Sequence, residues 1–272
     1  MKKLAVILAM FTMSAWASDI VLMTLSPTNA TSSYYTNSPG VFVYTPGLTN
    51  VTYAWWETDA VIAVSVSAGA YIDDSGYQTF VTNIGGVTIV TNSGVPALLI
   101  NGANKSVEFT GTSLASASHT EWLSFWVYLV GTPGDNESIM TFGTAASYRS
   151  LLAYIRNWGT GPDLTAATRG SGGDIDSGHN VPAGAWHHCI LQLRLNGAMS
   201  PIDFWMDGTN TASTLVLANG PTGDMPIWIG DVDSLWCTNE YINYVQCGNA
   251  TMVTARAAAI YSNGLSLHLG TP

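Results

Sequence analysis

The chain has 272 residues, of which 47% are hydrophobic and 10% are charged. That apolar content can fill a sizeable core, which excludes a disordered chain. Eighteen acidic residues against eight basic ones give a formal charge of −10. Such a surface repels phosphate groups, so nucleic acid and anionic membranes are excluded as expected partners.

The N-terminus has the three parts of a secretory signal peptide. Residues 2 and 3 are lysines, residues 4–13 form a largely apolar stretch, and Ala-Trp-Ala at 15–17 forms the small-x-small cleavage pattern. The apolar run is too short to span a bilayer, and no later segment is long enough to do so. We therefore predict a bacterial-type signal peptide at 1–17 and a mature protein that is secreted or held at the cell surface. Cleavage removes two basic groups and no acid, which leaves a formal charge of −12.

The segment 18–58 is rich in Thr, Ser, Asn and Pro and contains aromatic pairs at 34–35 and 55–56. We predict an extended N-terminal arm or an extra edge strand ahead of the main domain at 59–272. Strand-forming residues of an arm could add to the open sheet edge of a neighbouring copy, so self-association is one hypothesis.

From residue 59 onward, short runs rich in Val, Ile, Thr, Tyr, Phe and Trp are separated by Gly, Pro, Asn and Asp. This pattern is typical of an all-β sandwich. Segment 164–185 is predicted to be a long polar loop. The predicted strands are 60–67, 87–91, 97–100, 106–109, 121–130, 137–142, 149–156, 187–195, 202–206, 226–229 and 251–261.

Two of these strands alternate with a period of two, which sends successive side chains to opposite faces of a sheet. In the first, Leu123, Phe125, Val127 and Leu129 share one face, and we assign that face to the core. The opposite face mixes aromatic and polar side chains, which fits a sheet surface that is partly in contact with water.

An ordered set of motifs resembles the laminin-G-like domains of the concanavalin A-like family. The motifs are WLSFWVYL at 122–129, IMTFG at 139–143, WHHCI at 186–190, IDFWMDG at 202–208, IWIG at 227–230 and AIYSNGLS at 259–266. The resemblance implies a two-sheet antiparallel jelly-roll sandwich. It also implies binding of carbohydrate or protein, adhesion, and in some members Ca²⁺ at the rim.

One departure from the family pattern concerns the last strand. That strand usually starts with an acidic residue in the family, whereas Thr254-Ala255-Arg256-Ala257 occupies the corresponding place here. An inherited metal site is put in doubt by this difference.

Sugar recognition stacks a sugar ring on an aromatic side chain and adds planar polar partners. Aromatic and polar residues on one sheet face could form such a site, and packing within the fold is the alternative for the tryptophans. Trp158, between Asn157 and Gly159, is the candidate in a loop. The candidate ligand-binding residues are Trp158, Trp126, Tyr128, Trp205, Asp203, Arg194 and Gln192.

No motif requires a cofactor, and Ca²⁺ is the one metal that the acidic turns could hold, because hard cations need clustered oxygen ligands. Ordinary turn chemistry is the alternative for each cluster. The candidate metal ligands are Asp135, Asn136 and Glu137, Asp174 with Asp176, and Asp231 with Asp233.

The three cysteines suggest two different roles. In an exported chain, Cys237 and Cys247 could close a disulfide. Cys189 lies in phase with leucines of its predicted strand, so we predict a buried structural thiol there.

No catalytic motif is evident. A retaining glycosidase of this architecture needs two carboxylates about 5–5.5 Å apart, but the chain lacks an E-x-D-x-E string, and Asp174-Ile175-Asp176 lies in a Gly-rich segment. His187 and His188 are predicted to form hydrogen bonds within the sheets. Three hypotheses follow: a secreted, non-catalytic module that binds carbohydrate or a cell-surface component, a self-assembling extracellular structural subunit, and a glycan-active enzyme.

Overall fold

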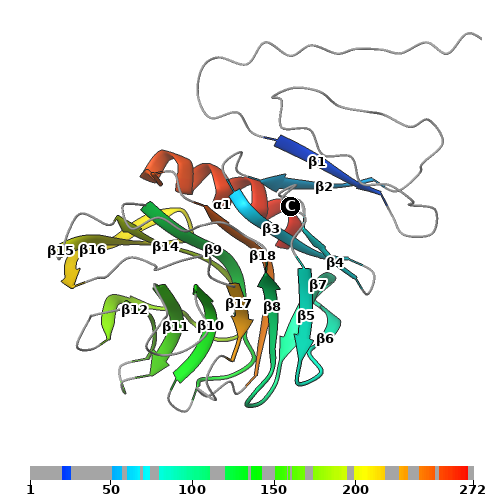
Figure 1. Cartoon of the computed structure of the whole chain (residues 1–272), viewed down its shortest axis with the longest axis horizontal. Helices are drawn as coiled ribbons and strands as arrows, with labels where there is room; N and C mark the ends of the chain where they lie inside the picture. The colour runs from blue at the N-terminus through cyan, green and yellow to red at the C-terminus, as the bar shows by residue number, and fades with distance from the viewer. Residues whose placement is uncertain are drawn as a thin grey trace, which may run out of the picture.

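The described residues of the computed structural model form two packed antiparallel sheets, a separate two-stranded sheet and a C-terminal helix (Figure 1). This arrangement confirms the predicted all-β, two-sheet antiparallel jelly-roll sandwich. The described residues are 20–25, 51–56, 60–67, 70–73, 80–110, 120–133, 136–142, 151–157, 159, 161–168, 174–194, 199–217, 227–231, 239–248 and 251–268.

Nine strands make up the larger sheet. They are β3 (Ala60–Ser67), β4 (Ala70–Asp73), β6 (Thr88–Asn92), β7 (Val95–Ile100), β9 (Thr120–Leu129), β14 (Trp186–Arg194), β15 (Met199–Met206), β16 (Thr209–Leu217) and β18 (Glu240–Gly248). Their order is β16-β15-β14-β9-β18-β3-β4, with β7 also paired to β18, and β6 to β7.

The second sheet has seven strands. They are β5 (Phe80–Ile84), β8 (Ser106–Thr110), β10 (Asn136–Phe142), β11 (Leu151–Asn157), β12 (Pro162–Thr168), β13 (Ile175–Asn180) and β17 (Ile227–Gly230). Their order is β13-β12-β11-β10-β17-β8-β5. Strands β1 (Ile20–Leu25) and β2 (Val51–Trp56) pair with each other in the two-stranded sheet.

The hydrophobic core lies between the two large sheets. Leu123, Phe125 and Leu129 of β9 are fully buried, as the alternation predicts, and they belong to one cluster with Ile155 of β11 and Ile227 of β17. Burying each such side chain stabilises the fold by about 1.5–3 kcal/mol. The core therefore fixes which face of each strand points inward and leaves the alternate residues on the two outer faces.

The last predicted strand, at 251–261, is wrong. Residues 254–261 of this segment belong to helix α1 (Thr254–His268), which lies on the outer face of the nine-stranded sheet (Figure 1). Its run of alanines favours a helix, and Ala257, Ile260 and Gly264 follow the helical spacing that places side chains on one face. Docking onto the sheet then buries that face.

Two further expectations about the chain need correction. The predicted loop 164–185 contains most of β12 and all of β13, because its Thr, Ala and Ile residues complete the edge of the seven-stranded sheet. The last strand in the sequence is β18, which lies between β9 and β3 in the nine-stranded sheet. It begins at Glu240, so the chain does have an acidic residue at the start of this strand.

The predicted signal peptide at 1–17 lies outside the described residues. Within the described part of the chain, no helix has both the length and the apolar character that crossing a membrane requires.

Candidate functional site

Helix α1 covers much of the outer face of the nine-stranded sheet. Trp122, Ile190 and Trp205 form one buried cluster with Ala257 and Ile260 of the helix. The sheet face that the alternation predicts to be partly wet is therefore a second, smaller core.

Gly264 allows α1 to approach the sheet closely. A Cβ atom at this position would lie 2.6 Å from the indole Nε1 of Trp126 and 2.9 Å from two of its ring carbons. Real Cβ atoms are not found that close to other heavy atoms, so a side chain here would push the helix outward. Trp126 is consequently 2% exposed and cannot stack on a sugar in this conformation.

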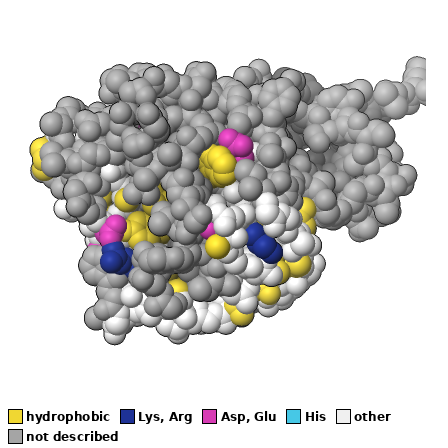
Figure 2. Space-filling view, turned by 60° about the horizontal axis from the view of Figure 1, so that its bottom comes forward, with side chains coloured by type: hydrophobic (Ala, Val, Ile, Leu, Met, Phe, Trp, Pro, Cys, Tyr) yellow, Lys and Arg dark blue, Asp and Glu magenta, His cyan; other side chains and the backbone are white. Residues whose placement is uncertain are grey.

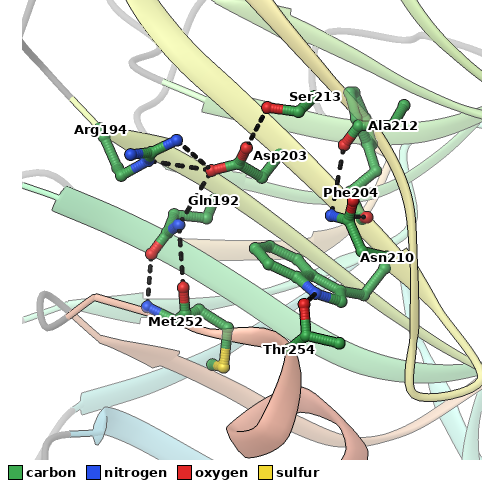
Figure 3. Close-up of polar contacts among 10 residues, drawn as sticks. Gln192, Arg194, Asp203, Phe204, Asn210, Ala212, Ser213, Met252 and Thr254 are labelled. Carbon is green, nitrogen blue, oxygen red and sulfur yellow. Dashed lines mark hydrogen bonds and ion pairs between the residues drawn. The ribbon is translucent and has the colours of Figure 1, made fainter.

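A pair of hydrogen bonds fastens the entry to α1 onto the sheet (Figure 3). The Gln192 side chain donates to the carbonyl of Met252 at 3.2 Å and accepts from the Met252 N–H at 2.5 Å. The indole N–H of Trp205 donates to Thr254 Oγ1 at 3.3 Å. Gln192 and Trp205 thus hold the chain's own C-terminal segment.

Asp203 sits at the centre of a satisfied polar network beside this attachment (Figure 3). Its Oδ2 accepts from Arg194 Nε at 2.9 Å and from Gln192 at 3.1 Å, and its Oδ1 accepts from the Ser213 hydroxyl at 2.5 Å. The structure therefore gives Gln192, Arg194, Asp203, Trp126 and Trp205 contacts within the fold, and their ligand-binding role stays a prediction. Of the three aromatic residues predicted to bind a ligand on this sheet, only Tyr128 is partly exposed.

A buried Ser–His pair lies under the same helix. A 2.8 Å hydrogen bond joins Ser124 Oγ to His188 Nε2, with both residues at most 1% exposed. The Asp207 carboxylate bonds the His187 ring at 2.9 Å and accepts from the backbone N–H of His188. These contacts confirm that both histidines form hydrogen bonds within the sheet.

The Asp207 carboxyl is held ionised by this setting. Burial acts to raise its pKa, but the hydrogen bonds from His187 and the His188 backbone, with the two nearby imidazoles, outweigh burial and place the pKa below the usual 3.8. Burial, together with the Asp207 charge, raises the pKa of the Cys189 thiol well above its ordinary value. Cys189 is fully buried, as predicted.

The outer face of the seven-stranded sheet has a different character. Thr141, Trp228 and Glu108 face one another across β10, β17 and β8, and Leu152 of β11 extends the row beyond Thr141. In a second row, Tyr154 of β11 lies opposite Ser138 and Thr165, so this face combines indole, phenol, hydroxyl and carboxylate groups.

Two polar atoms at the centre of this face lack a protein partner. The hydroxyl of Thr141 and the indole N–H of Trp228 are buried, and neither makes a hydrogen bond. Thr141 itself is 1% exposed, and leaving a buried polar group unsatisfied costs about 1–3 kcal/mol. The two residues are direct cross-strand neighbours, so a donor and a hydroxyl stand side by side with no partner.

The same face also has partly exposed groups. Trp228 and its cross-strand neighbour Glu108 retain partial exposure, and so does Arg156, farther along β11, which forms an ion pair with Asp174. Figure 2, which turns the lower side of Figure 1 forward, shows an acidic and a basic side chain next to each other beside hydrophobic ones. We take this face as the candidate functional site.

Among the described side chains, the predicted metal ligands Asp174, Asp176 and Asp231 do not form a metal site. Asp174 is paired with Arg156, Asp176 Oδ1 accepts the Gly178 N–H at 2.8 Å, and Asp231 Oδ2 accepts the Asn104 N–H at 2.6 Å. No three His, Cys, Asp or Glu side chains of the described residues gather as a metal site. The side chains of Asp135, Asn136, Glu137 and Asp233 lie outside the described ones.

Two other predictions concern residues whose surroundings are not described. Trp158 and Cys237 lie outside the described residues, while Cys247 is fully buried in β18. The Trp158 binding role and the Cys237–Cys247 disulfide therefore stay predictions.

Sequence reasoning missed Trp228 and Thr141 as site residues. The signal for Trp228 was present, since Ile227 and Ile229 flank it and both are core residues. Period-two geometry then sends the indole to the opposite face. Thr141 follows from Trp228 only once the β10–β17 register is known.

The chain belongs to the concanavalin A-like lectin/glucanases superfamily. The family profile of a laminin G domain in this superfamily matches residues 101–243, which is more than half of the chain. A comparison with curated proteins gave no match.

Several solved structures share the fold at low sequence identity. The binding domain of botulinum neurotoxin DC, in complex with rat synaptotagmin II, has a TM-score of 0.58 and 13% identity, covering 75% of this chain and 51% of that one. A botulinum neurotoxin type C structure, whose title links cell entry to two ganglioside molecules, has a TM-score of 0.55, 13% identity and coverages of 75% and 51%. This chain thus spans about half the length of these toxin domains.

A third similar structure is domain 4 of AbnA, an extracellular arabinanase from Geobacillus stearothermophilus, in complex with arabinotriose. It has a TM-score of 0.55 and 12% identity, and the match covers 75% of this chain and 98% of that domain.

Proposed function

We propose that this protein is a secreted, non-catalytic module that binds carbohydrate on the outer face of its seven-stranded sheet. The observation that carries the proposal is the pair formed by the Thr141 hydroxyl and the Trp228 indole N–H, adjacent across β10 and β17 and both without a partner.

The chemistry of this face suits a sugar. A sugar offers hydroxyls that both donate and accept hydrogen bonds, so one ligand can satisfy the indole donor and the threonine hydroxyl together once the side chains that bury these two atoms move aside. The partly exposed ring of Trp228 supplies an apolar surface next to them, and the Glu108 carboxylate beside it can accept from further hydroxyls.

The similar structures also support a binding role. One is described in complex with arabinotriose, one in relation to gangliosides, and one in complex with synaptotagmin II. Each title names a molecule that the protein binds or interacts with, which fits a binding role for this chain.

The buried polar groups argue against hydrolysis by a Ser–His–Asp arrangement. Ser124 and His188 are hydrogen-bonded, but α1 and the sheet bury both, and Asp207 bonds the ring of His187 instead of that of His188. A triad needs the carboxylate on the same imidazole that contacts the serine. We therefore propose binding without catalysis.

A glycan array tests the proposal. Mature protein is applied to immobilised neutral and acidic oligosaccharides, arabinotriose among them, beside Trp228→Ala and the control Tyr241→Ala on the opposite sheet. We expect binding to at least one neutral glycan, at least ten-fold weaker in Trp228→Ala and unchanged in Tyr241→Ala. Retention of full binding by Trp228→Ala would refute this site, and an array with no bound glycan would refute the function.

Two additional arms address secretion and calcium. Mass spectrometry of protein exported by a bacterial host should give a mature chain beginning at Ser18, and uncleaved protein in the cytoplasm would contradict secretion.

Glycan binding should persist in EDTA, since the proposed contacts come from protein groups alone. Loss of binding in EDTA would contradict this direct recognition.

A further inference from the structure

A group of aromatic side chains on the nine-stranded sheet is not fully covered by α1. Trp186, Tyr128 and Tyr241 are neighbours across β14, β9 and β18. They belong to one cluster with Tyr244 and, on the helix, Tyr261. The four tyrosines are all partly exposed, and we call these five residues the aromatic cluster.

The rings of Trp186, Tyr128 and Tyr241 meet edge to face. Tyr128 lies 5.8 Å from Trp186 at an interplanar angle of 62°, and 5.8 Å from Tyr241 at 64°. In this geometry, ring faces are not all used up by stacking on one another. Tyr261 stacks on Trp126 at 5.7 Å and 17°, so the ring surface left for a ligand is that of the partly exposed Tyr128 and Tyr241.

Tyr244 is held in this cluster by an unusual backbone. Its φ is 46°, in the left-handed region that a bulky residue rarely adopts. The register between β18 and β9 shifts between Asn243 and Gln246, which marks a bulge, and the Tyr244 N–H donates to Asn243 Oδ1 at 2.7 Å. A bulge changes the direction of the side chains beside it, and strained backbone is concentrated at binding sites. The position of the Tyr244 ring is therefore obtained at the cost of local backbone strain.

One acidic side chain lies beside the cluster, in a chain whose formal charge is −10. Asp207 stands at the helix side of the cluster, where burial and then the Asp207 charge raise the pKa of Tyr261. An aromatic face attracts a cation through its quadrupole, and a nearby carboxylate adds to that attraction.

We propose that the aromatic cluster binds an alkylated ammonium group of the choline type. Such a group has an apolar methyl surface that packs on the tyrosine rings and a positive charge that their faces and Asp207 attract. This site lies on the opposite sheet from the proposed carbohydrate site and does not depend on it.

Choline and its uncharged isostere, 3,3-dimethylbutan-1-ol, separate charge recognition from apolar packing. Mature protein is titrated with each compound while tryptophan and tyrosine fluorescence is followed, with potassium chloride at matched ionic strength as the salt control. We expect saturable choline binding in the millimolar range and at least five-fold weaker binding of the alcohol. Equal affinities, or no saturation by choline at 50 mM, would overturn the proposal.

Four variants locate the site. Tyr241→Leu and Tyr128→Leu keep apolar volume but remove a ring, so each should weaken choline binding at least five-fold, whereas Tyr241→Phe keeps the ring and should bind as the natural chain does. Trp228→Ala should also bind choline normally. Unchanged affinity in both leucine variants, with circular dichroism showing that they are folded, would refute this location.

A vesicle experiment distinguishes the sources of the group. Co-sedimentation with phosphatidylcholine vesicles, but not with phosphatidylglycerol vesicles, would support a lipid-borne headgroup. Choline binding without co-sedimentation would support an ammonium group carried by a soluble or polymeric ligand.

Discussion

The outer faces of the two sheets carry similar residues but differ in what satisfies them. On the nine-stranded sheet, Gln192 and Trp205 find hydrogen-bond partners in the segment that leads into α1. On the seven-stranded sheet, Thr141 and Trp228 have polar atoms with no protein partner. The same alternation of aromatic and polar residues therefore serves internal docking on one face and leaves two polar atoms without a hydrogen bond on the other.

The comparison teaches that an aromatic residue on a sheet surface is not informative by itself. Trp126 and Trp228 both lie opposite the core, yet the first is 2% exposed beneath Gly264 and the second stays partly exposed. Their substitutions should therefore have different consequences.

The largest expected effect on stability comes from Trp126→Ala. Removing this buried indole leaves a cavity between α1 and the sheet, so the free energy of unfolding should fall by about 3–5 kcal/mol in urea denaturation. Trp228→Ala should cost less than about 1.5 kcal/mol, because its ring is partly exposed and its N–H has no partner to lose. Equal losses in the two variants would contradict the distinction between the faces.

A smaller loss is expected for Gly264→Ala. The added Cβ would meet the Trp126 ring at 2.6–2.9 Å, and such overpacking costs about 1–3 kcal/mol. Thermal and urea denaturation measure the change, and Ser262→Ala on the exposed side of the same helix is the control. A Gly264→Ala protein more stable than the natural chain would show that the helix does not dock as described.

The pH dependence of stability should reflect Asp207. Its pKa is lower in the folded state than the usual 3.8, so its stabilising contribution is fully present above about pH 4. That contribution is lost as pH falls through the folded pKa, because the unfolded chain takes up the proton first. Acid titration of unfolding should therefore be less steep in Asp207→Asn below about pH 4, and identical slopes would contradict the assignment.

Much of the fold could be predicted because the strong signals are local. The alternation in β9 and the inward Leu191 and Leu193 of β14 define the core without any knowledge of pairing. Helix α1 was missed because its alanine-rich segment is short and follows the motif order of the family. The acidic start sought at residue 254 is at Glu240, the first residue of β18.

The site was harder to predict than the fold because it depends on which face the helix covers. The sequence shows that Trp205 and Trp228 each alternate with core residues, and nothing local distinguishes them. The difference arises from Met252 and Thr254, which meet the nine-stranded sheet only after the chain has folded. Pairing of Thr141 with Trp228 likewise depends on strand register.

The most direct test of this account is the Thr141→Val variant, measured for both stability and binding, with the exposed Thr214→Val as control. Valine keeps the shape and removes a buried hydroxyl that has no protein partner, so unfolding free energy should stay equal or rise by about 1 kcal/mol. Affinity for the glycan that the natural chain binds on the array should fall at least five-fold. A Thr141→Val protein that binds this glycan with unchanged affinity would contradict the central claim that this face is the ligand surface.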